Sequence, residues 1–236
     1  NLLKILFIIS TYLKNVRKME ILEKFNINPN NEELFKTAFI HSSYSSYANL
    51  DYNYERLEFL GDSVLSMLVS DYLQGMYPDY GEGKLTKLRS NYVCQAALEV
   101  YSQKLGLDKC IKINLEDNNI TENEILSISA DVFESFLGAI YLDQGIDKAR
   151  EFLRENIYPF IDKNIIFFYD FKSQIKEYGD AEDIDIHYEL VEEYGAPHDK
   201  TFIMAIIIDG IEYGFMENVC NRVTLIRKYI KQFLSA

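Results

Sequence analysis

Five carboxylates in two short segments are spaced so that helices would bring them together. Glu55, Glu58 and Asp62 stand at positions i, i+3 and i+7, which an α-helix turns to one face about 60° wide. Asp131 and Glu134 form a second pair at i and i+3. Apolar residues flank both groups, which favours two helices that lie against a core. The two acidic stripes can then meet.

Carboxylates gathered beside a core repel one another, and their pKa values rise unless a cation neutralises them. Magnesium fits this need because it takes oxygen ligands, keeps several waters and can activate one of them against a phosphodiester. The opposing interpretation is that each stripe is a solvated helix face, which is the usual position of acids three and four residues apart. Spacing alone leaves both interpretations open.

Other residues offer weaker chemistry. His41 is the only histidine of the region before residue 170, and we interpret it as a structural residue at a helix start rather than a general base. Three isolated cysteines, Cys94, Cys110 and Cys220, indicate neither a disulfide framework nor a thiolate zinc site, and are typical of a reducing cytoplasm. The glycines around Glu82 are too few for a phosphate-binding fingerprint and predict a loop.

Helical periodicity runs from Met19 to about Lys163, with apolar residues three and four apart and breaks near residues 78–83 and 114–124. This predicts an all-α domain over residues 19–163 and a linker at 164–169. Residues 1–18 precede the pattern. Their apolar run is too short to span a bilayer and lacks a cleavage site. We interpret them as an extension outside the native fold; a peripheral membrane helix is the alternative.

The pattern changes at Asp170. A predicted helix leads into three strand-like runs, and a second helix closes the chain. The helix spans Phe171–Tyr178 and the runs are Ile186–Glu192, Thr201–Ile208 and Ile211–Met216. Asp209 and Gly210 between the last two runs are a two-residue hairpin signal. The predicted fold is therefore multidomain: an all-α domain followed by a small α+β domain of α-β-β-β-α order over residues 170–236.

Charge argues against bulk attraction to polyanions, because the chain has a formal net charge of -13 and a pI near 4.7. Residues 19–169 hold 24 acids and 13 bases, and residues 170–236 hold 13 acids and 7 bases. Neither predicted domain is basic. Any function on nucleic acid must therefore rest on local sites.

The run ERLEFLGDSVL, from Glu55 to Leu65, resembles the signature of the ribonuclease III family. Matching segments also occur at His41–Tyr44, Glu82–Arg89 and Ala130–Asp143, and the resemblance covers nearly everything after Met19. It implies an all-α endonuclease domain that cuts double-stranded RNA in RNA processing, leaving 5′-phosphates and short 3′ overhangs. It further implies dependence on Mg²⁺, with Mn²⁺ as a substitute, and a cytoplasmic homodimer without a membrane.

The same resemblance assigns roles to residues. The metal-binding carboxylates are Glu58, Asp62, Asp131 and Glu134, of which Asp62 and Glu134 are also the catalytic pair. Glu55 and Glu82 match outer, supporting carboxylates. Phe59 matches the aromatic that family members insert into a socket on the partner subunit; the alternative is an ordinary core phenylalanine.

The C-terminal region resembles the double-stranded RNA-binding domain. The matching positions expected to bind RNA are Gln174, Glu177 and His198, which would contact ribose hydroxyls, and Arg222. Two features depart from the family. The lysine pair at the start of the last helix is replaced by Asn218–Arg222, and the glycine-rich basic loop before the second acid pair is the acidic stretch 118–124. Both departures predict weakened RNA binding and leave the metal ligands intact.

Two other functions remain as alternatives. A non-cleaving duplex-RNA-binding or regulatory protein on the same fold would fit the acidic surface but not the intact carboxylates. A helical metal-dependent phosphohydrolase acting on small nucleotides would leave the C-terminal domain unexplained. Incubation with duplex RNA, single-stranded RNA and nucleotides, with and without magnesium, separates the three.

Overall fold

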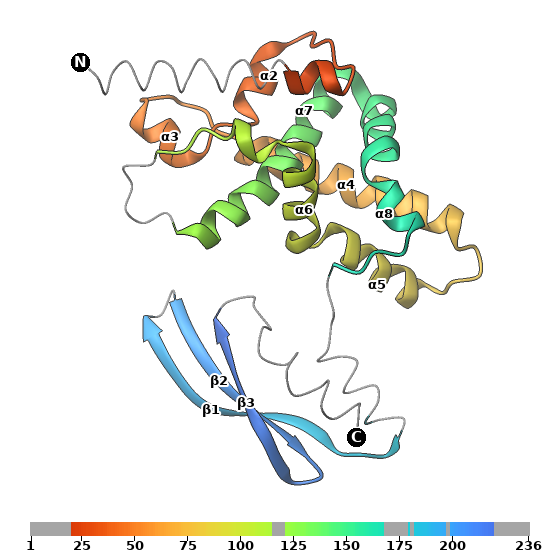
Figure 1. The fold of residues 1–236 in the computed structure, drawn as a ribbon, viewed down its shortest axis with the longest axis vertical. Coiled ribbons are helices and arrows are strands. Elements are labelled where there is room, and N and C mark those ends of the chain that lie inside the picture. Colours follow the sequence, from red (N-terminus) through yellow and green to blue (C-terminus); the bar gives the residue numbers. More distant parts are fainter. Residues whose placement is uncertain (1–19, 115–120, 168–178, 180–181, 197–198, 220–236) are drawn as a thin grey trace. The chain divides into compact units, whose positions relative to one another are not determined.

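The computed structural model describes residues 20–114, 121–167, 179, 182–196 and 199–219 (Figure 1). The chain divides into two compact units, Asn1–Phe168 and Tyr169–Ala236, and each is described by itself. The extension predicted at residues 1–18 and both helices predicted for the C-terminal domain lie outside the described residues. A mostly helical unit followed by a small antiparallel sheet confirms the predicted order of the two fold classes.

The described part of the first unit is helical. Its elements are α2 (Glu32–Thr37), α3 (Ser42–Tyr47), α4 (Glu55–Met76), α5 (Glu82–Val93), α6 (Gln95–Leu105), the 3₁₀ helix η1 (Asp108–Cys110), α7 (Glu122–Asn156) and α8 (Tyr158–Asp162). The segment around Glu82, predicted as a loop, is instead the start of α5. Gly81 is its extended N-cap (φ −70°, ψ 163°) and the helix begins at Glu82. Glycine suits this position because an N-cap residue has non-helical backbone angles, so its poor helix propensity costs nothing there.

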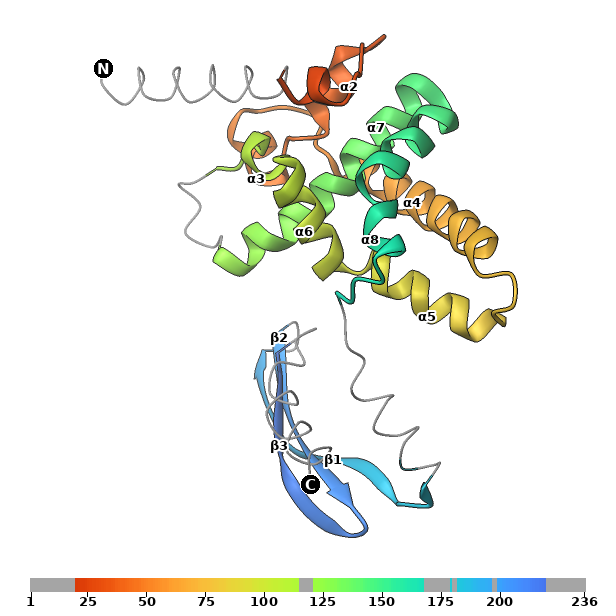
Figure 2. The same cartoon turned by 45° about the vertical axis from the view of Figure 1, so that its right-hand side comes forward.

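Helix α7 is the core of this unit, with α4 and α6 packed against it (Figures 1 and 2). Its apolar residues at helical spacing, such as Phe133, Leu137 and Ile140, are fully buried, as the periodicity predicts. By length and composition the part Glu124–Asn156 could also cross a membrane, but its backbone is non-helical at Gly145 (φ 82°, ψ −178°) and 61% of its most apolar window is buried inside the protein. Burial of this kind is typical of a central core helix.

Helix α7 begins earlier than the sequence pattern suggested. The polar stretch 114–124 was predicted as a break, yet its last three residues are the first turn of α7. Thr121 caps this turn: its Oγ1 accepts from the backbone N–H of Glu124, and the Glu124 carboxylate accepts from the backbone N–H of Thr121. This capping box stabilises a helix start in polar sequence.

Two glycines allow α4 and α7 to cross in backbone contact. A Cβ at Gly61 would lie 1.8 Å from the backbone oxygen of Glu134, and a Cβ at Gly138 would lie 2.3 Å from the backbone oxygen of Leu57. No side chain fits in either place. The crossing therefore sets the carboxylates of α4 directly against those of α7.

The second unit contains an antiparallel sheet of order β1-β2-β3. The strands are β1 (Ile186–Ala196), β2 (Asp199–Ile208) and β3 (Ile211–Val219), and all three confirm and extend the predicted runs. Asp209 and Gly210 have φ values of 49° and 75°, as a tight two-residue hairpin turn requires.

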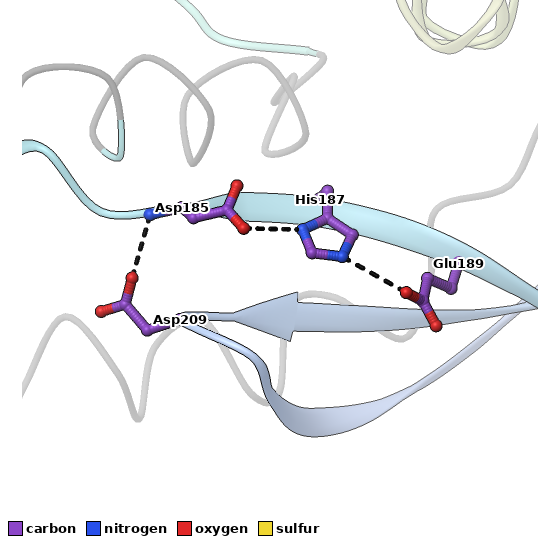
Figure 3. A network of polar contacts seen from close by, with 4 residues as sticks. All are labelled: Asp185, His187, Glu189 and Asp209. Carbon is purple, nitrogen blue, oxygen red and sulfur yellow. Dashed lines mark hydrogen bonds and ion pairs between the residues drawn. The ribbon is translucent and has the colours of Figure 1, made fainter.

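Polar contacts join this hairpin to the start of β1 (Figure 3). Asp209 N–H donates to the Asp185 carbonyl (2.8 Å) and Asp185 N–H donates to Asp209 Oδ1 (3.0 Å). On the same strand, His187 lies between two carboxylates, with Nδ1 3.2 Å from Asp185 and Nε2 3.4 Å from Glu189. These contacts hold the His187 side chain at the surface of the sheet.

Candidate active site

Helix α4 supplies the first acidic stripe. Glu55 and Glu58 lie in its first turn, where the unpaired N–H groups and the helix dipole favour negative charge. Asp62 follows one turn later. Glu55 and Asp62 are exposed, whereas Glu58 between them is half-buried.

Helix α7 supplies the second stripe. Asp131 and Glu134 are both half-buried, and their neighbours Val132, Phe133 and Ser135 are fully buried. The apolar residues fix the rotation of α7 about its axis, because they fill the core. That rotation leaves the two carboxylates on the side that meets α4.

The crossing at Gly61 brings the two stripes together, and their electrostatics reflect this. Burial raises the pKa of Glu134 to about 8, helped by the charges of Asp62, Glu58 and Asp131. Burial likewise raises the pKa of Glu58 to about 7, followed by the charges of Asp131, Glu55 and Asp62. Because each helix contributes to the shift on the other, the structure brings together the four carboxylates predicted as metal ligands.

Asp131 has a partner that sequence reasoning missed. Tyr54 Oη donates a hydrogen bond to Asp131 Oδ2 at 2.9 Å. Burial raises the pKa of Asp131, while the Tyr54 hydrogen bond and the nearby His41 lower it. Tyr54 stands just before the acidic stripe in sequence, but no spacing rule links it to a residue 77 positions away.

His41 has the structural position that we expected. It is the N-cap of α3, and its Nδ1 accepts from the backbone N–H of Ser43 at 3.2 Å. Its ring also lies 5.8 Å from the ring of Tyr54, centroid to centroid. His41 therefore lies beside Tyr54, the hydrogen-bond donor to Asp131.

The donor set suits a hard divalent cation. All four groups are carboxylates, and a positive charge would relieve the repulsion that raises the pKa of Glu58 and Glu134. Among the described residues, no three His, Cys, Asp or Glu side chains are already arranged as a metal cage. Magnesium does not need one, since it keeps several waters and takes few protein ligands.

The two outer carboxylates are placed differently. Glu55 lies beside the cluster and contributes to the raised pKa of Glu58. Glu82 does not appear among the groups that shift Glu58 or Glu134. It lies at the start of α5, where its Oε1 accepts from Thr86 Oγ1 at 3.0 Å, and it lines a separate cavity of about 510 Å³ with Tyr77 and Arg89.

Phe59 is not a core residue. Its side chain is 78% exposed on α4, because it lies about 200° around the helix from the buried Leu57. It borders a groove of about 820 Å³ whose lining includes Leu34, Tyr52 and Leu142. The alternative interpretation of Phe59 as an ordinary core phenylalanine is therefore wrong.

The four predicted RNA-binding residues, Gln174, Glu177, His198 and Arg222, lie outside the described part of the chain.

Comparison with known proteins identifies the family of this chain. A family model described as ribonuclease-III-like matches residues 31–161. Ribonuclease 3 of Listeria monocytogenes is 39% identical over 200 residues, which are 83% of this chain and 87% of that protein. The chain belongs to the ribonuclease III family. The resemblance carried by ERLEFLGDSVL is thereby confirmed.

Two further ribonuclease III proteins are similar. Ribonuclease 3 of Staphylococcus aureus is 39% identical over 185 residues, 76% of each chain. The solved nuclease domain of ribonuclease III from Campylobacter jejuni is 30% identical, with a TM-score of 0.54 over 59% of this chain and 94% of that one. That structure is described as flexible in a region involved in dimer formation. The likeness is to a helical nuclease domain.

Proposed function

We propose that this protein is an endoribonuclease that hydrolyses phosphodiester bonds in double-stranded RNA during RNA processing, leaving 5′-phosphates and short 3′ overhangs. The observation that carries the proposal is the crossing of α4 and α7 at Gly61, which sets Glu58 and Asp62 against Asp131 and Glu134. Similarity to ribonuclease 3 proteins over most of the chain supports it.

In this proposal the four carboxylates hold Mg²⁺, and Mn²⁺ can substitute. When bound, the cation supplies positive charge to the phosphate and lowers the pKa of water. The protein's own contribution is positional. Glu58 and Asp62 are held by one helix and Asp131 and Glu134 by the other, so the helix crossing sets the backbone positions from which the ligands reach the metal. Asp62 and Glu134, which belong to different helices, are proposed as the catalytic pair.

The half-buried carboxyls also store protons. With pKa values of about 7 and 8, Glu58 and Glu134 carry protons for part of the time near neutral pH. Binding of a cation requires the charged forms, so it expels those protons. Glu55, beside them, and Glu82, on α5, are proposed as supporting carboxylates toward the RNA.

We further propose a cytoplasmic homodimer, with Phe59 as a contact to the partner subunit and one site for each RNA strand. The exposed ring beside an apolar groove supports this contact. The α-β-β-β-α region is proposed as a double-stranded RNA-binding domain, supported by its three antiparallel strands. No membrane association is proposed.

Cleavage of perfect duplex RNA, single-stranded RNA and nucleotides, with and without Mg²⁺, tests the function. Duplex RNA alone should be cut, and only with Mg²⁺. Glu134→Gln conserves volume and removes a charge from the cluster, so it should abolish cleavage while the protein still folds and dimerises. Near-normal cleavage by this variant would remove Glu134 from the catalytic set. Duplex binding without cleavage by the unaltered protein would favour the regulatory alternative.

A further inference from the structure

Asp131 differs from its neighbours in the carboxylate cluster by having a hydrogen-bond donor. Tyr54 Oη donates to its Oδ2 at 2.9 Å. The pKa values of Glu58 and Glu134 respond only to burial and to other charges, and no hydrogen bond from a described residue contributes to either. Asp131 is therefore the cluster carboxylate that a hydrogen bond from a described residue holds in place.

The donor itself is held in place from several directions. Tyr54 is only 3% exposed. Its backbone N–H donates to the Ile40 carbonyl at 2.9 Å, and its own carbonyl accepts from the N–H groups of Leu57 and Glu58 at the start of α4. Its ring lies against that of His41, which caps α3. The phenol oxygen therefore has a position fixed by two helix starts.

A neutral hydroxyl suits a carboxylate that must still bind a cation. It occupies a lone pair on one oxygen and so restricts the rotation of the carboxylate, but it leaves the negative charge in place. A lysine or arginine in the same position would neutralise that charge and compete with the metal. The other oxygen of Asp131, Oδ1, receives no hydrogen bond from a described residue.

We propose that Tyr54 is a positioning residue, whose hydrogen bond fixes the Asp131 carboxylate in the orientation that receives the divalent cation. The inference rests on the proposed function, because it needs Asp131 to be a ligand. Partners of this kind behind a metal ligand typically change metal affinity or activity by about 10- to 100-fold. A role in packing alone would leave metal affinity unaltered.

The test measures the affinity of the full chain for Mn²⁺ in the absence of RNA. The electron paramagnetic resonance signal of free Mn²⁺ gives the bound fraction at each concentration. Tyr54→Phe keeps the ring and removes the donor, and it should weaken Mn²⁺ binding about tenfold. Tyr72→Phe is the matched control, because Tyr72 Oη donates to Asp162 Oδ1 at 2.6 Å away from the cluster. It should bind Mn²⁺ like the unaltered protein. In cleavage, Tyr54→Phe should need about tenfold more Mg²⁺ for half-maximal rate, with KM for duplex RNA unchanged.

The outcomes separate the two proposals. If the unaltered protein binds no Mn²⁺, the metal site of the proposed function fails, and the positioning role fails with it. If the unaltered protein binds Mn²⁺ and Tyr54→Phe binds it within about twofold, the positioning role is overturned and the proposed function stands. Should Tyr54→Phe melt too low to assay, the comparison is made in a Gly75→Ala background. A Cβ at Gly75 meets nothing within 4 Å, and alanine strengthens a helix.

Discussion

At the scale of the residue, burial gives the cluster its chemistry. Glu134 and Glu58 are ordinary acids whose half-burial near other acids raises their pKa values to about 8 and 7. Without a cation this arrangement is unfavourable, because charge is confined in a medium of low polarity. In the proposed metal site, the same repulsion would favour binding of a divalent ion. Stability and the proposed metal binding are therefore linked at these side chains.

This linkage predicts how the metal-free protein responds to pH. Between about pH 5 and 8 the folded state retains a proton on Glu134 that the unfolded state has released, so stability falls as pH rises through this range. Glu134→Gln removes that loss. We expect its Tm without metal to exceed that of the unaltered protein by about 3 °C or more at pH 8, since about 2–4 °C corresponds to 1 kcal/mol at this chain length.

The difference in Tm should shrink toward pH 5, where the Glu134 carboxyl is neutral in the folded state. Added Mg²⁺ should raise the Tm of the unaltered protein at pH 8 more than that of Glu134→Gln. Scanning calorimetry in chelator and in Mg²⁺ measures both effects. Parallel pH profiles for the two proteins would mean that Glu134 titrates normally in the folded state.

At the scale of the element, the site depends on how closely two helices approach. Side-chain spacing puts each acidic stripe on one face of its helix, but only the glycines at the crossing let the faces meet. Gly61 contacts the backbone of Glu134 itself. Packing of α4 on α7 and assembly of the site are therefore the same event.

Gly61→Ala tests this dependence. Its Cβ would lie 1.8 Å from a backbone oxygen, and backbone cannot move aside as a flexible side chain does. We expect a loss of about 3 kcal/mol or more in unfolding free energy, at the upper end for overpacked sites, together with loss of cleavage. Urea titration measures the unfolding free energy, and the assay with duplex RNA measures cleavage.

Gly75→Ala is the control on the same helix, because its Cβ would meet nothing within 4 Å. There alanine should stabilise α4 by up to about 1 kcal/mol and leave cleavage unchanged. Equal effects of the two substitutions would show that the crossing tolerates a wider separation of the helices than the structure has.

At the scale of the whole molecule, an exposed aromatic ring and an acidic surface have to be explained together. Phe59 is 78% exposed, which is costly in water for a side chain of its size. The formal charge of -13 opposes RNA binding by either unit through general attraction. Association with a second copy would cover the Phe59 ring. It would also double the number of carboxylate sites that one RNA duplex can contact.

Phe59→Ala should shift the protein toward monomer. In the proposed dimer, emptying a socket on the partner subunit costs about 3 kcal/mol or more at each of two symmetry-related contacts, whereas an exposed ring contributes little to the isolated chain. Sedimentation velocity over a range of concentrations measures the shift. Val100→Ala, which truncates a side chain 40% exposed on α6, should leave the association unchanged. A Phe59→Ala protein that stays dimeric at low concentration would exclude this contact.

The C-terminal unit should bind duplex RNA with a shallow salt dependence. Residues 170–236 hold 13 acids and 7 bases, and each phosphate contact contributes about 0.9 to the slope of log affinity against log salt. Deleting these residues should therefore change affinity and slope less than in a relative with a basic final helix, and lysines at Val219 and Cys220 should tighten binding and steepen the slope. Salt titrations of the intact chain, the deletion variant and the double-lysine variant measure the affinity and the slope of each. A steep slope that collapses on deletion would show that the unit binds RNA competently.

The sequence by itself determined the features that depend on neighbouring residues. Helical periodicity predicted the all-α unit, and two strand-like runs joined by Asp209 and Gly210 predicted the hairpin. Both predictions were possible because backbone dihedrals and side-chain periods are local properties. The spacing of Glu55, Glu58 and Asp62 likewise placed them on one helix face. Family resemblance then indicated which of two open interpretations of that face applied.

Only the tertiary structure decided how distant segments meet. It showed that Gly61 lies on the backbone of Glu134, that Tyr54 reaches Asp131, and that Phe59 faces outward rather than into the core. Each of these depends on the rotation and separation of whole helices, which the entire apolar core determines. The raised pKa values follow from the same packing, since burial and neighbouring charge exist only once α4 and α7 have crossed.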